Sequence, residues 1–233
     1  MEERFARYLM AFDERHRDAV VRNDPDKPHR AVIIDSRRDL FLPMVLRNVM
    51  HFLGEDWNLQ VFCGTHNQAW LQRHLDGWAI DVSVINVARI PVAQYNRILM
   101  SEAFWQRFPE NDLLVFQADS LMCGHHIADF MEWDYIGAPC MDGSIYNGGF
   151  SYRKREAMLA AIATHGQAPQ SEVEDVFFSK ALRAEGARLP DPQTAARFSV
   201  ESHYVAHPVG VHGTDKYYLS EDVVRRIIGG IEE

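Results

Sequence analysis

Apolar, β-branched segments alternate with segments of helical periodicity through the first half of this 233-residue chain. The apolar segments are AVIID (31–35), LQVFC (59–63), AIDVSVINV (79–87) and DLLVFQA (112–118). Continuous apolar runs are typical of strands buried on both faces, and strands that alternate with helices are typical of parallel sheets with right-handed crossovers. The sequence therefore predicts an α/β fold with a mostly parallel central sheet and helices on both faces.

The second half of the chain is less regular. YIGAP (135–139) and FSYR (150–153) are predicted to be short strands on either side of a glycine-containing loop. KREAMLAAIATHG (154–166) and EDVFFSKALRAEG (174–186) have helical spacing, and FSVES (198–202) is predicted to be a late strand. The regular strand–helix alternation is thus confined to the first half.

The sequence favours one domain with a helical extension at each end. A chain of 233 residues is close to the upper size limit for one hydrophobic core. Residues 1–29 have apolar residues at helical spacing and then two prolines, so they are expected to form an N-terminal helix and a linker. Residues 30–220 are expected to form the domain, and 221–233 an amphipathic C-terminal helix. The apolar stripe of that helix could form a homodimer interface, contact a membrane surface or pack on the core.

The charge balance limits the partners of the protein. Its 33 acidic and 24 basic residues give a net charge of −9, which repels a nucleic acid polymer. Cys63, Cys123 and Cys140 are odd in number and widely spaced, so neither a disulfide framework nor a four-thiolate zinc site is expected. The charged N-terminal segment lacks the features of a secretory signal, and no apolar run approaches the roughly 18 residues of a membrane span. A cytoplasmic protein is expected, with peripheral contact at the inner membrane face left open.

Polar residues follow two of the predicted strands. Asp35, Ser36 and Arg38 follow the first strand, and Asp119 follows the fourth. Ligands of such sheets bind beyond the carboxyl ends of the strands, so these side chains are expected at one crevice. Arg38 would contact phosphate there or remain a solvated surface charge. Mg²⁺ or Mn²⁺ takes few protein oxygens and fills its other positions with water and phosphate, so Asp119 is a candidate ligand, unless it only caps a turn.

A late histidine and a lysine could join this crevice. His212 stands in PVGVHG, where neighbouring glycines permit close approach of a ligand, and imidazole binds Mn²⁺ well. A lone histidine is also often a structural residue. Lys216 would meet a diphosphate or simply open the C-terminal helix. Tyr95 and Asn96 are weaker candidates for contact with the ligand.

Two further strings contain candidate residues. Glu174 and Asp175 begin a predicted helix, and a capping box from Ser171 to Glu174 would explain Glu174 but not Asp175. A carboxylate that projects from a helix start into a crevice could act as a general base. Gly148 and Gly149 either remove side chains from a wall against which a ligand lies or form an ordinary hairpin turn.

Several of these strings occur in a recognisable order. VIIDSRRD, LRNVMHFLG, FQADS, WDYIGAP with NGGFSYR, EDVFF, FSVES and PVGVHG extend over roughly residues 30–220. Together they resemble a bacterial family of glycosyltransferases with the GT-A fold, formerly designated only as a domain of unknown function. The resemblance implies a Rossmann-like nucleotide half joined to a smaller acceptor-side half, a nucleoside-diphosphate sugar donor such as a UDP-sugar, and a divalent cation, Mn²⁺ or Mg²⁺.

The resemblance also implies roles for single residues. Gln117, Ala118 and Asp119 stand where these enzymes commonly have an Asp-x-Asp triplet, so Asp119 is expected to contact the metal or the ribose-phosphate. His212 matches the late histidine ligand, and Asp175 or Glu174 matches the acidic pair that supplies the base in inverting relatives. The other expected contacts are Asp35, Ser36, Arg38, Tyr95, Asn96, Gln117 and Lys216 for the donor nucleotide, and Asn147, Gly148 and Gly149 for the acceptor or sugar.

The function expected from the resemblance is transfer of a sugar to a hydroxyl of a glycan or lipid-linked acceptor, with inversion, in cell-surface polysaccharide or glycoconjugate synthesis. Two alternatives remain open at this point. One is a non-catalytic protein that binds nucleotides or glycans. The other is a metal-dependent phosphohydrolase, whose ligands would be Asp35, Asp119, His125, His126 and His212.

Overall fold

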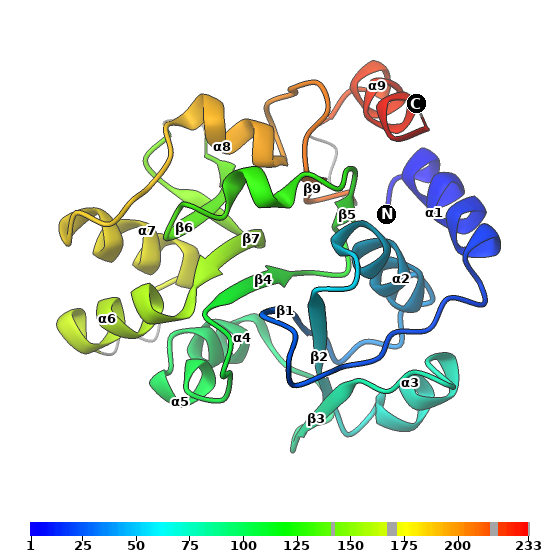
Figure 1. The fold of residues 1–233 in the computed structure, drawn as a ribbon, viewed down its shortest axis with the longest axis horizontal. Helices are drawn as coiled ribbons and strands as arrows, with labels where there is room; N and C mark the ends of the chain where they lie inside the picture. The colour runs from blue at the N-terminus through cyan, green and yellow to red at the C-terminus, as the bar shows by residue number, and fades with distance from the viewer. Residues whose placement is uncertain (141–142, 167–171, 215–218, 233) are drawn as a thin grey trace.

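A six-stranded sheet forms the centre of the molecule, with the strand order β3-β2-β1-β4-β7-β6 (Figure 1). The computed structural model describes residues 1–140, 143–166, 172–214 and 219–232. Strands β1 to β4 pair in parallel, whereas β7 runs antiparallel to both of its neighbours, β4 and β6, so five of the six strands share one direction. The predicted mostly parallel α/β fold is confirmed. The bounds are β1 His29–Ile34, β2 Trp57–Gly64, β3 Asp81–Ile85, β4 Asp112–Phe116, β6 Tyr135–Pro139 and β7 Tyr146–Lys154.

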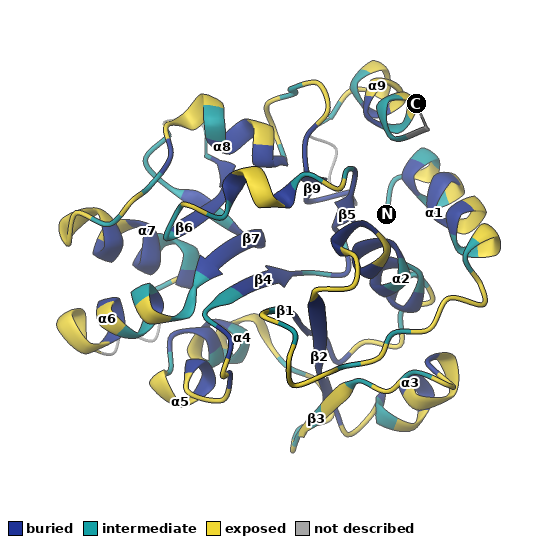
Figure 2. Cartoon of the chain, in the orientation of Figure 1, coloured by how far each residue is buried: buried dark blue, intermediate teal, exposed yellow. Residues whose placement is uncertain are grey.

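Helices lie on both faces of this sheet (Figure 1). On one side α1 and α2 pack against each other, on the other side α4 to α7 contact one another, and α8 packs on the edge strand β6. The central strands β1, β2 and β4 are buried along almost their whole length, whereas the edge strand β3 is largely exposed (Figure 2). The bounds are α1 Glu3–Arg15, α2 Phe41–Leu53, α3 Gln68–His74, α4 Val92–Leu99, α5 Glu102–Trp105, η1 Ile127–Phe130, α6 Arg155–His165, α7 Glu174–Ala184, α8 Pro192–Phe198 and α9 Glu221–Glu232.

A second, smaller sheet connects the late part of the chain to the loop after β4. It contains β5 (Leu121–Met122), β9 (Gly210–Val211) and β8 (Ser199–Val200), with β9 in the middle. Beyond β9, the backbone N–H and the hydroxyl of Thr214 donate to the Asp119 carbonyl at 3.0 and 2.9 Å. The small sheet and these two hydrogen bonds therefore hold the end of β9 beside Asp119.

The predicted loop at Asn147–Gly149 is wrong. Strand β7 begins at Tyr146 and continues through both glycines, because pairing with β4 extends beyond Phe116 to the hydrogen bond from the Gln117 N–H to the Gly149 carbonyl at 2.8 Å. The hairpin turn lies earlier, between Pro139 and Tyr146, which face each other across β6 and β7. The glycines are therefore required for something other than a turn.

The two ends of the chain meet on one side of the molecule, where α9 lies beside α1 (Figure 1). Arg4 donates to the carboxylate of Glu221 at 2.7 Å and to its carbonyl at 3.0 Å. Val224 and Ile227, in the apolar stripe of α9, are buried within the chain. Of the three roles left open for this stripe, packing on the core is the one observed. Among the described helices, none combines the length and apolar character needed to cross a bilayer.

Candidate active site

Most of the predicted site residues line one cavity of about 370 Å³ at the carboxyl edge of the central sheet. Strand β1 ends just before Asp35, and β4 ends just before Gln117. Because β7 runs the other way, its first residues lie at the same edge. The predicted residues that line the cavity are Asp35, Ser36, Tyr95, Asn96, Gln117, Asn147, Gly148, Gly149, Glu174, Asp175 and His212.

One corner of the cavity brings a late histidine to a mid-sequence carboxylate. His212 follows β9 and is 2 % exposed. Its Nε2 lies 3.6 Å from Oδ1 of Asp119 and 3.3 Å from Oε1 of Gln117. The predicted proximity of Asp119 and His212 is therefore observed, although 93 residues separate them in the sequence.

Glu201 completes this corner, and the sequence analysis did not single it out. Its Oε1 lies 3.4 Å from Nδ1 of His212 and 3.5 Å from the amide nitrogen of Asn147. The Nδ1 atom is buried and makes no hydrogen bond within the described residues, and its carboxylate neighbour is Glu201. Glu201 directly follows the short strand β8, so the signal that identified Asp119, a carboxylate at the end of a strand, applied to Glu201 as well.

The two glycines of β7 make room for other side chains of the protein. A Cβ atom at Gly149 would overlap the imidazole of His212, and one at Gly148 would overlap the carboxylate of Glu174. Neither glycine has a positive φ, so space rather than backbone conformation requires them. The side chains that lie against these glycines belong to the chain itself, and the predicted contact of the glycines with a sugar or acceptor stays a prediction.

A buried ion pair lies against Gly148. Arg153 is fully buried, and its guanidinium donates to both carboxylate oxygens of Glu174 at 2.7 and 3.0 Å. The guanidinium carbon lies 5.0 Å from the centre of the Tyr135 ring, and Trp105 and Phe178 flank it at 5.9 and 5.6 Å. Burial is the largest single effect and disfavours the charged guanidinium, but the charge and hydrogen bonds of Glu174, together with Tyr135 and Tyr95, outweigh it and hold the pKa of Arg153 above its ordinary value. Glu174 is therefore committed to Arg153.

Asp175 is the neighbouring carboxylate and lines the cavity. Burial, and then the charge of Glu174, raise the pKa of Asp175 above its ordinary value. One of its oxygens accepts the backbone N–H of Val176 at 2.7 Å. Helix α7 begins at Glu174 with Val173 as its N-cap, so Glu174 is not the third helical residue that a capping box requires. Ser171, the other half of that box, lies outside the described residues.

The wall formed by β1 and α4 is polar. Arg37 binds the carboxylate of Asp35 through Nε and Nη2, at 3.1 and 2.6 Å, and the Ser36 hydroxyl accepts the Ile90 N–H at 2.8 Å. The hydroxyl of Tyr95 is buried beside Gln117, and no well-formed hydrogen bond satisfies it within the described part of the chain. Burial, and then the charge of Glu174, raise the pKa of Tyr95, so this hydroxyl is a neutral donor at physiological pH.

Four of the predicted residues that the structure describes are not among those that line the cavity: Asp119, whose carboxylate lies beside His212, and Arg38, His125 and His126. Arg38 donates to the His66 carbonyl at 3.0 and 2.7 Å and borders a neighbouring hollow with Ser36. Nδ1 of His125 lies 3.0 Å from the Phe52 carbonyl oxygen. Neither His125 nor His126 lines the cavity, so the ligand set of the phosphohydrolase alternative is not assembled. Lys216 lies outside the described residues.

The corner at His212 suits a divalent cation that takes only a few protein ligands. Asp119 and His212 offer a carboxylate oxygen and an imidazole nitrogen side by side, and Glu201 lies on the other nitrogen of the ring. A carboxylate in that position is the usual outer partner of a metal-binding histidine. Within the described residues, no group of three or more His, Cys, Asp or Glu side chains could hold a metal alone. The fit is therefore to Mn²⁺ or Mg²⁺ with ligand oxygens and water in the remaining positions.

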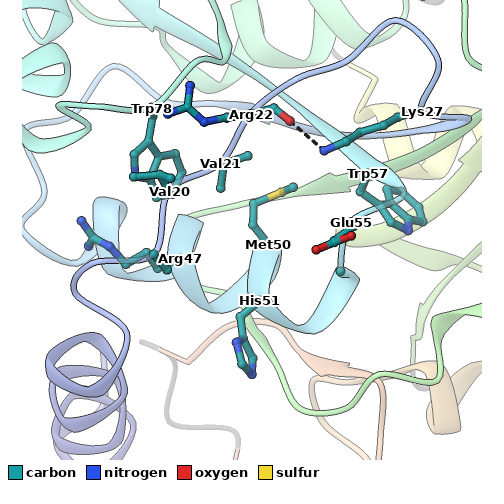
Figure 3. A pocket seen from close by; sticks show the side chains of 12 residues that line it. Val20, Val21, Arg22, Lys27, Arg47, Met50, His51, Glu55, Trp57 and Trp78 are labelled. Carbon is teal, nitrogen blue, oxygen red and sulfur yellow. Dashed lines mark hydrogen bonds between the residues drawn. The ribbon is translucent and has the colours of Figure 1, made fainter.

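A different cavity, of about 240 Å³, lies at the amino edge of the sheet (Figure 3). Its walls come from the linker before β1, the end of α2 and Trp57 at the start of β2. Two of the cations around it have partners within the chain. Arg47 contacts Asp13 at 2.5 Å and lies 5.6 Å from the Trp78 ring, and Lys27 donates to the Arg22 carbonyl at 2.7 Å. None of the predicted site residues lines this cavity.

The sequence and the fold both resemble known proteins. A family model described as "Protein of unknown function (DUF5672)" matches residues 82–212, which is more than half of the chain. No curated protein sequence matches the chain.

Two solved structures show the fold that the chain shares. One is mannosyltransferase PcManGT from Pyrobaculum calidifontis in complex with GDP-Man and Mn²⁺, with a TM-score of 0.53, 13 % identity, and coverage of 81 % of this chain and 64 % of that one. The other is the apo form of glycosyltransferase GlyE from Streptococcus pneumoniae TIGR4, with a TM-score of 0.51, 11 % identity, and coverage of 83 % and 55 %. The chain therefore has a GT-A-type fold and spans less than two thirds of the length of either structure.

Proposed function

The chain belongs to the DUF5672 family, and we propose that it is a glycosyltransferase that moves a sugar from a nucleoside diphosphate to a hydroxyl group. One observation carries the proposal: His212, whose Nε2 lies 3.6 Å from the Asp119 carboxylate, and Asp175 line the same cavity at the carboxyl edge. A fold shared with two glycosyltransferases supports it, and one of these is bound to GDP-Man and Mn²⁺.

The donor would lie with its diphosphate at the His212 corner and its nucleoside along β1 and α4. Asp119 and His212 would hold a divalent cation, which when bound supplies positive charge to the departing diphosphate. The buried hydroxyl of Tyr95 lies beside Gln117 without a well-formed hydrogen bond among the described residues and can donate to a phosphate or sugar oxygen. Ser36 and Asn96 line the same wall and would contact the nucleoside.

Asp175 would act as the general base. The acceptor oxygen attacks the anomeric carbon, the bond from that carbon to the diphosphate oxygen breaks, and the hydroxyl proton moves to the Asp175 carboxylate. Glu174 is unsuited to this role because both of its oxygens accept hydrogen bonds from Arg153. A single carboxylate of this kind fits one displacement with inversion, since a retaining double displacement requires a further nucleophile.

Glu201 would be a positioning residue in this scheme. Its carboxylate 3.4 Å from Nδ1 of His212 favours the tautomer that has its proton on Nδ1, which leaves the lone pair of Nε2 directed toward Asp119 and the cation. Its second neighbour, the amide of Asn147, links this corner to the first residues of β7.

The proposal is tested by offering the purified protein UDP-, GDP-, CMP- and dTDP-sugars with and without Mn²⁺. We expect one class of nucleotide sugar to raise the melting temperature, with a larger rise when Mn²⁺ is present, and to release the corresponding nucleotide slowly by hydrolysis. Asp119→Asn serves as the control, because it should lose the part of the response that depends on Mn²⁺.

Two results would contradict the proposal. Hydrolysis of nitrophenyl phosphate without turnover of any nucleotide sugar would favour the phosphohydrolase. Binding of a nucleotide sugar with neither hydrolysis nor transfer to any hydroxyl acceptor would favour a non-catalytic binding protein.

A further inference from the structure

A further cavity, which we call the apolar cavity, has a volume of about 580 Å³. Its walls come from the end of β6, from α8 and from the segment after β8. The residues that line it are Pro139, Cys140, Gly143, Pro192, Gln193, Ala196, Arg197, His203 and Val205. Most of these are apolar or small, and none of them is a carboxylate.

The apolar cavity adjoins the candidate active site. Pro139 pairs with Tyr146, the residue before Asn147, so the end of β6 lies at the same edge of the sheet as the active-site cavity. Glu201 contacts His212, and His203 lines the apolar cavity two residues later. Because consecutive Cα atoms are 3.8 Å apart, the Cα atoms of Glu201 and His203 are within about 7.6 Å of each other. One short segment therefore contributes to both sites.

Among the described residues that line the apolar cavity, Arg197 is the charged one. It is exposed, and its guanidinium carbon lies 5.9 Å from the Phe130 ring. His203 is also exposed, with its Nδ1 3.1 Å from the Ser202 hydroxyl. In a chain with a net charge of −9, a guanidinium at the rim of an apolar hollow favours a ligand that is apolar at one end and anionic next to it. Arginine binds phosphate and carboxylate groups through paired N–H donors.

We propose that the apolar cavity binds the apolar part of the acceptor, and that Arg197 and His203 bind a phosphate group that joins this part to the hydroxyl-bearing end. The identification of this ligand as the acceptor rests on the proposed function, whereas the binding itself does not depend on it. The hydroxyl-bearing end would pass the Glu201–His203 segment and reach Asp175 in the active-site cavity. The apolar part is either a lipid chain or a small ring, and the test separates these two.

Binding is measured by calorimetry with butyl, hexyl, octyl and dodecyl phosphate, in the absence of any nucleotide sugar. We expect each added methylene to tighten binding about fourfold until the cavity is full. Affinity that still rises from octyl to dodecyl phosphate indicates a lipid chain, and a plateau at hexyl phosphate indicates a small apolar group. Either result supports the proposal. Inorganic phosphate or octyl glucoside binding as tightly as octyl phosphate would overturn it.

Three variants locate the site. Gln193→Trp places a large side chain at an exposed position of the wall and should weaken octyl phosphate binding at least about tenfold. Arg197→Gln removes the guanidinium and should weaken it about tenfold. Arg15→Gln, at an exposed position on α1, changes the net charge equally and should leave the affinity unchanged. Equal loss in Arg15→Gln and Arg197→Gln would show non-specific attraction and contradict the proposal.

A competition assay connects this site to catalysis. Octyl phosphate should slow transfer to an added acceptor but leave hydrolysis of the donor in the absence of acceptor unchanged. Turnover of a nucleotide sugar together with no binding of any alkyl phosphate would defeat this inference alone. Binding of alkyl phosphates by a protein that turns over no nucleotide sugar would instead defeat the proposed function and leave the binding site in place.

Discussion

Charged residues are arranged differently at the two edges of the central sheet. At the amino edge, Arg30 donates to Glu110 at 2.8 Å and to Asp81 at 2.5 Å, and Arg47 pairs with Asp13, so the carboxylates there face guanidinium groups. At the carboxyl edge, Glu174 is paired with Arg153 and Asp35 with Arg37 in the same way, but Asp175 has a raised pKa. Asp119 and Glu201 approach the same histidine from its two nitrogens.

We expect this difference to mark the edge that binds a ligand. Around the cavity at the amino edge, Arg47 is paired with Asp13 and Lys27 donates to the Arg22 carbonyl (Figure 3). A carboxylate with a raised pKa, such as Asp175, costs stability when it is ionised. The variants below test whether the carboxyl edge is the functional one.

The largest expected effect is the loss of transfer in Asp175→Asn. Removal of the general base should lower the rate by about 100- to 10,000-fold, while donor binding, measured by calorimetry, stays nearly constant. The same reasoning predicts that the wild-type rate rises with pH until Asp175 is ionised. Unaltered turnover in Asp175→Asn would remove this residue from the mechanism.

The stability of Asp175→Asn should change in the opposite direction to its activity. Since the pKa of Asp175 is raised in the folded protein, the folded state binds more protons than the unfolded state between the ordinary and the raised pKa. The free energy of unfolding of the wild type thus falls as pH rises through this window, and asparagine avoids the loss. Asp175→Asn should melt at a higher temperature than the wild type at pH 7 and at about the same temperature below the window.

Arg153→Met and Arg30→Met should both cost about 3–5 kcal/mol of unfolding free energy, because each leaves a buried carboxylate unpaired. Only Arg153→Met should also reduce transfer, since only its partner, Glu174, lies next to Asp175. Chemical denaturation and transfer assays of the two variants compare the edges directly. Equal activity of the two variants would contradict the contrast between the edges.

Gly149→Ala should weaken Mn²⁺ binding by about 10- to 100-fold, because the added methyl group displaces the imidazole of His212. Glu201→Gln should weaken it less, by about tenfold, because the amide still accepts a hydrogen bond from Nδ1. Both are measured by titration with Mn²⁺ alone and followed by electron paramagnetic resonance. Unchanged affinity in Gly149→Ala would mean that His212 is not a ligand.

The smallest effect is expected far from both edges. Arg4→Gln breaks the ion pair to Glu221 between α1 and α9, in which the side chains are 32 % and 79 % exposed. Such pairs contribute at most about 1 kcal/mol, so the melting temperature should fall slightly and transfer should stay unchanged. A loss of transfer in this variant would connect the chain ends to the active site and weaken the contrast.

The sequence predicted the placement of residues that follow parallel strands. Asp35 and Gln117 could be placed because the carboxyl ends of parallel strands share one edge, and this rule needs only the strand pattern. The position of His212 depends on the small sheet, whose two-residue strands give almost no periodic signal. His212 became a candidate through the glycines of PVGVHG and through family resemblance.

The partners of Glu174 and His212 could not be predicted from local sequence. The pairing of Arg153 with Glu174 depends on the register of the antiparallel strand β7. The sequence pattern had indicated a loop in the first half of that strand. Glu201 was missed because its role depends on a contact with Nδ1 of a histidine in another strand–loop unit. Contacts of this kind follow from tertiary structure, whereas strand ends follow from local pattern.

The central claim is that Asp119, His212 and Asp175 act on one nucleotide sugar. The most direct test is a crystal structure of the Asp175→Asn variant with Mn²⁺ and the nucleotide sugar identified by thermal shift, with the metal located by its anomalous signal. We predict the Mn²⁺ peak between Asp119 and His212, in contact with the diphosphate, and the anomeric carbon facing position 175. A metal peak or a diphosphate outside this cavity would contradict the account.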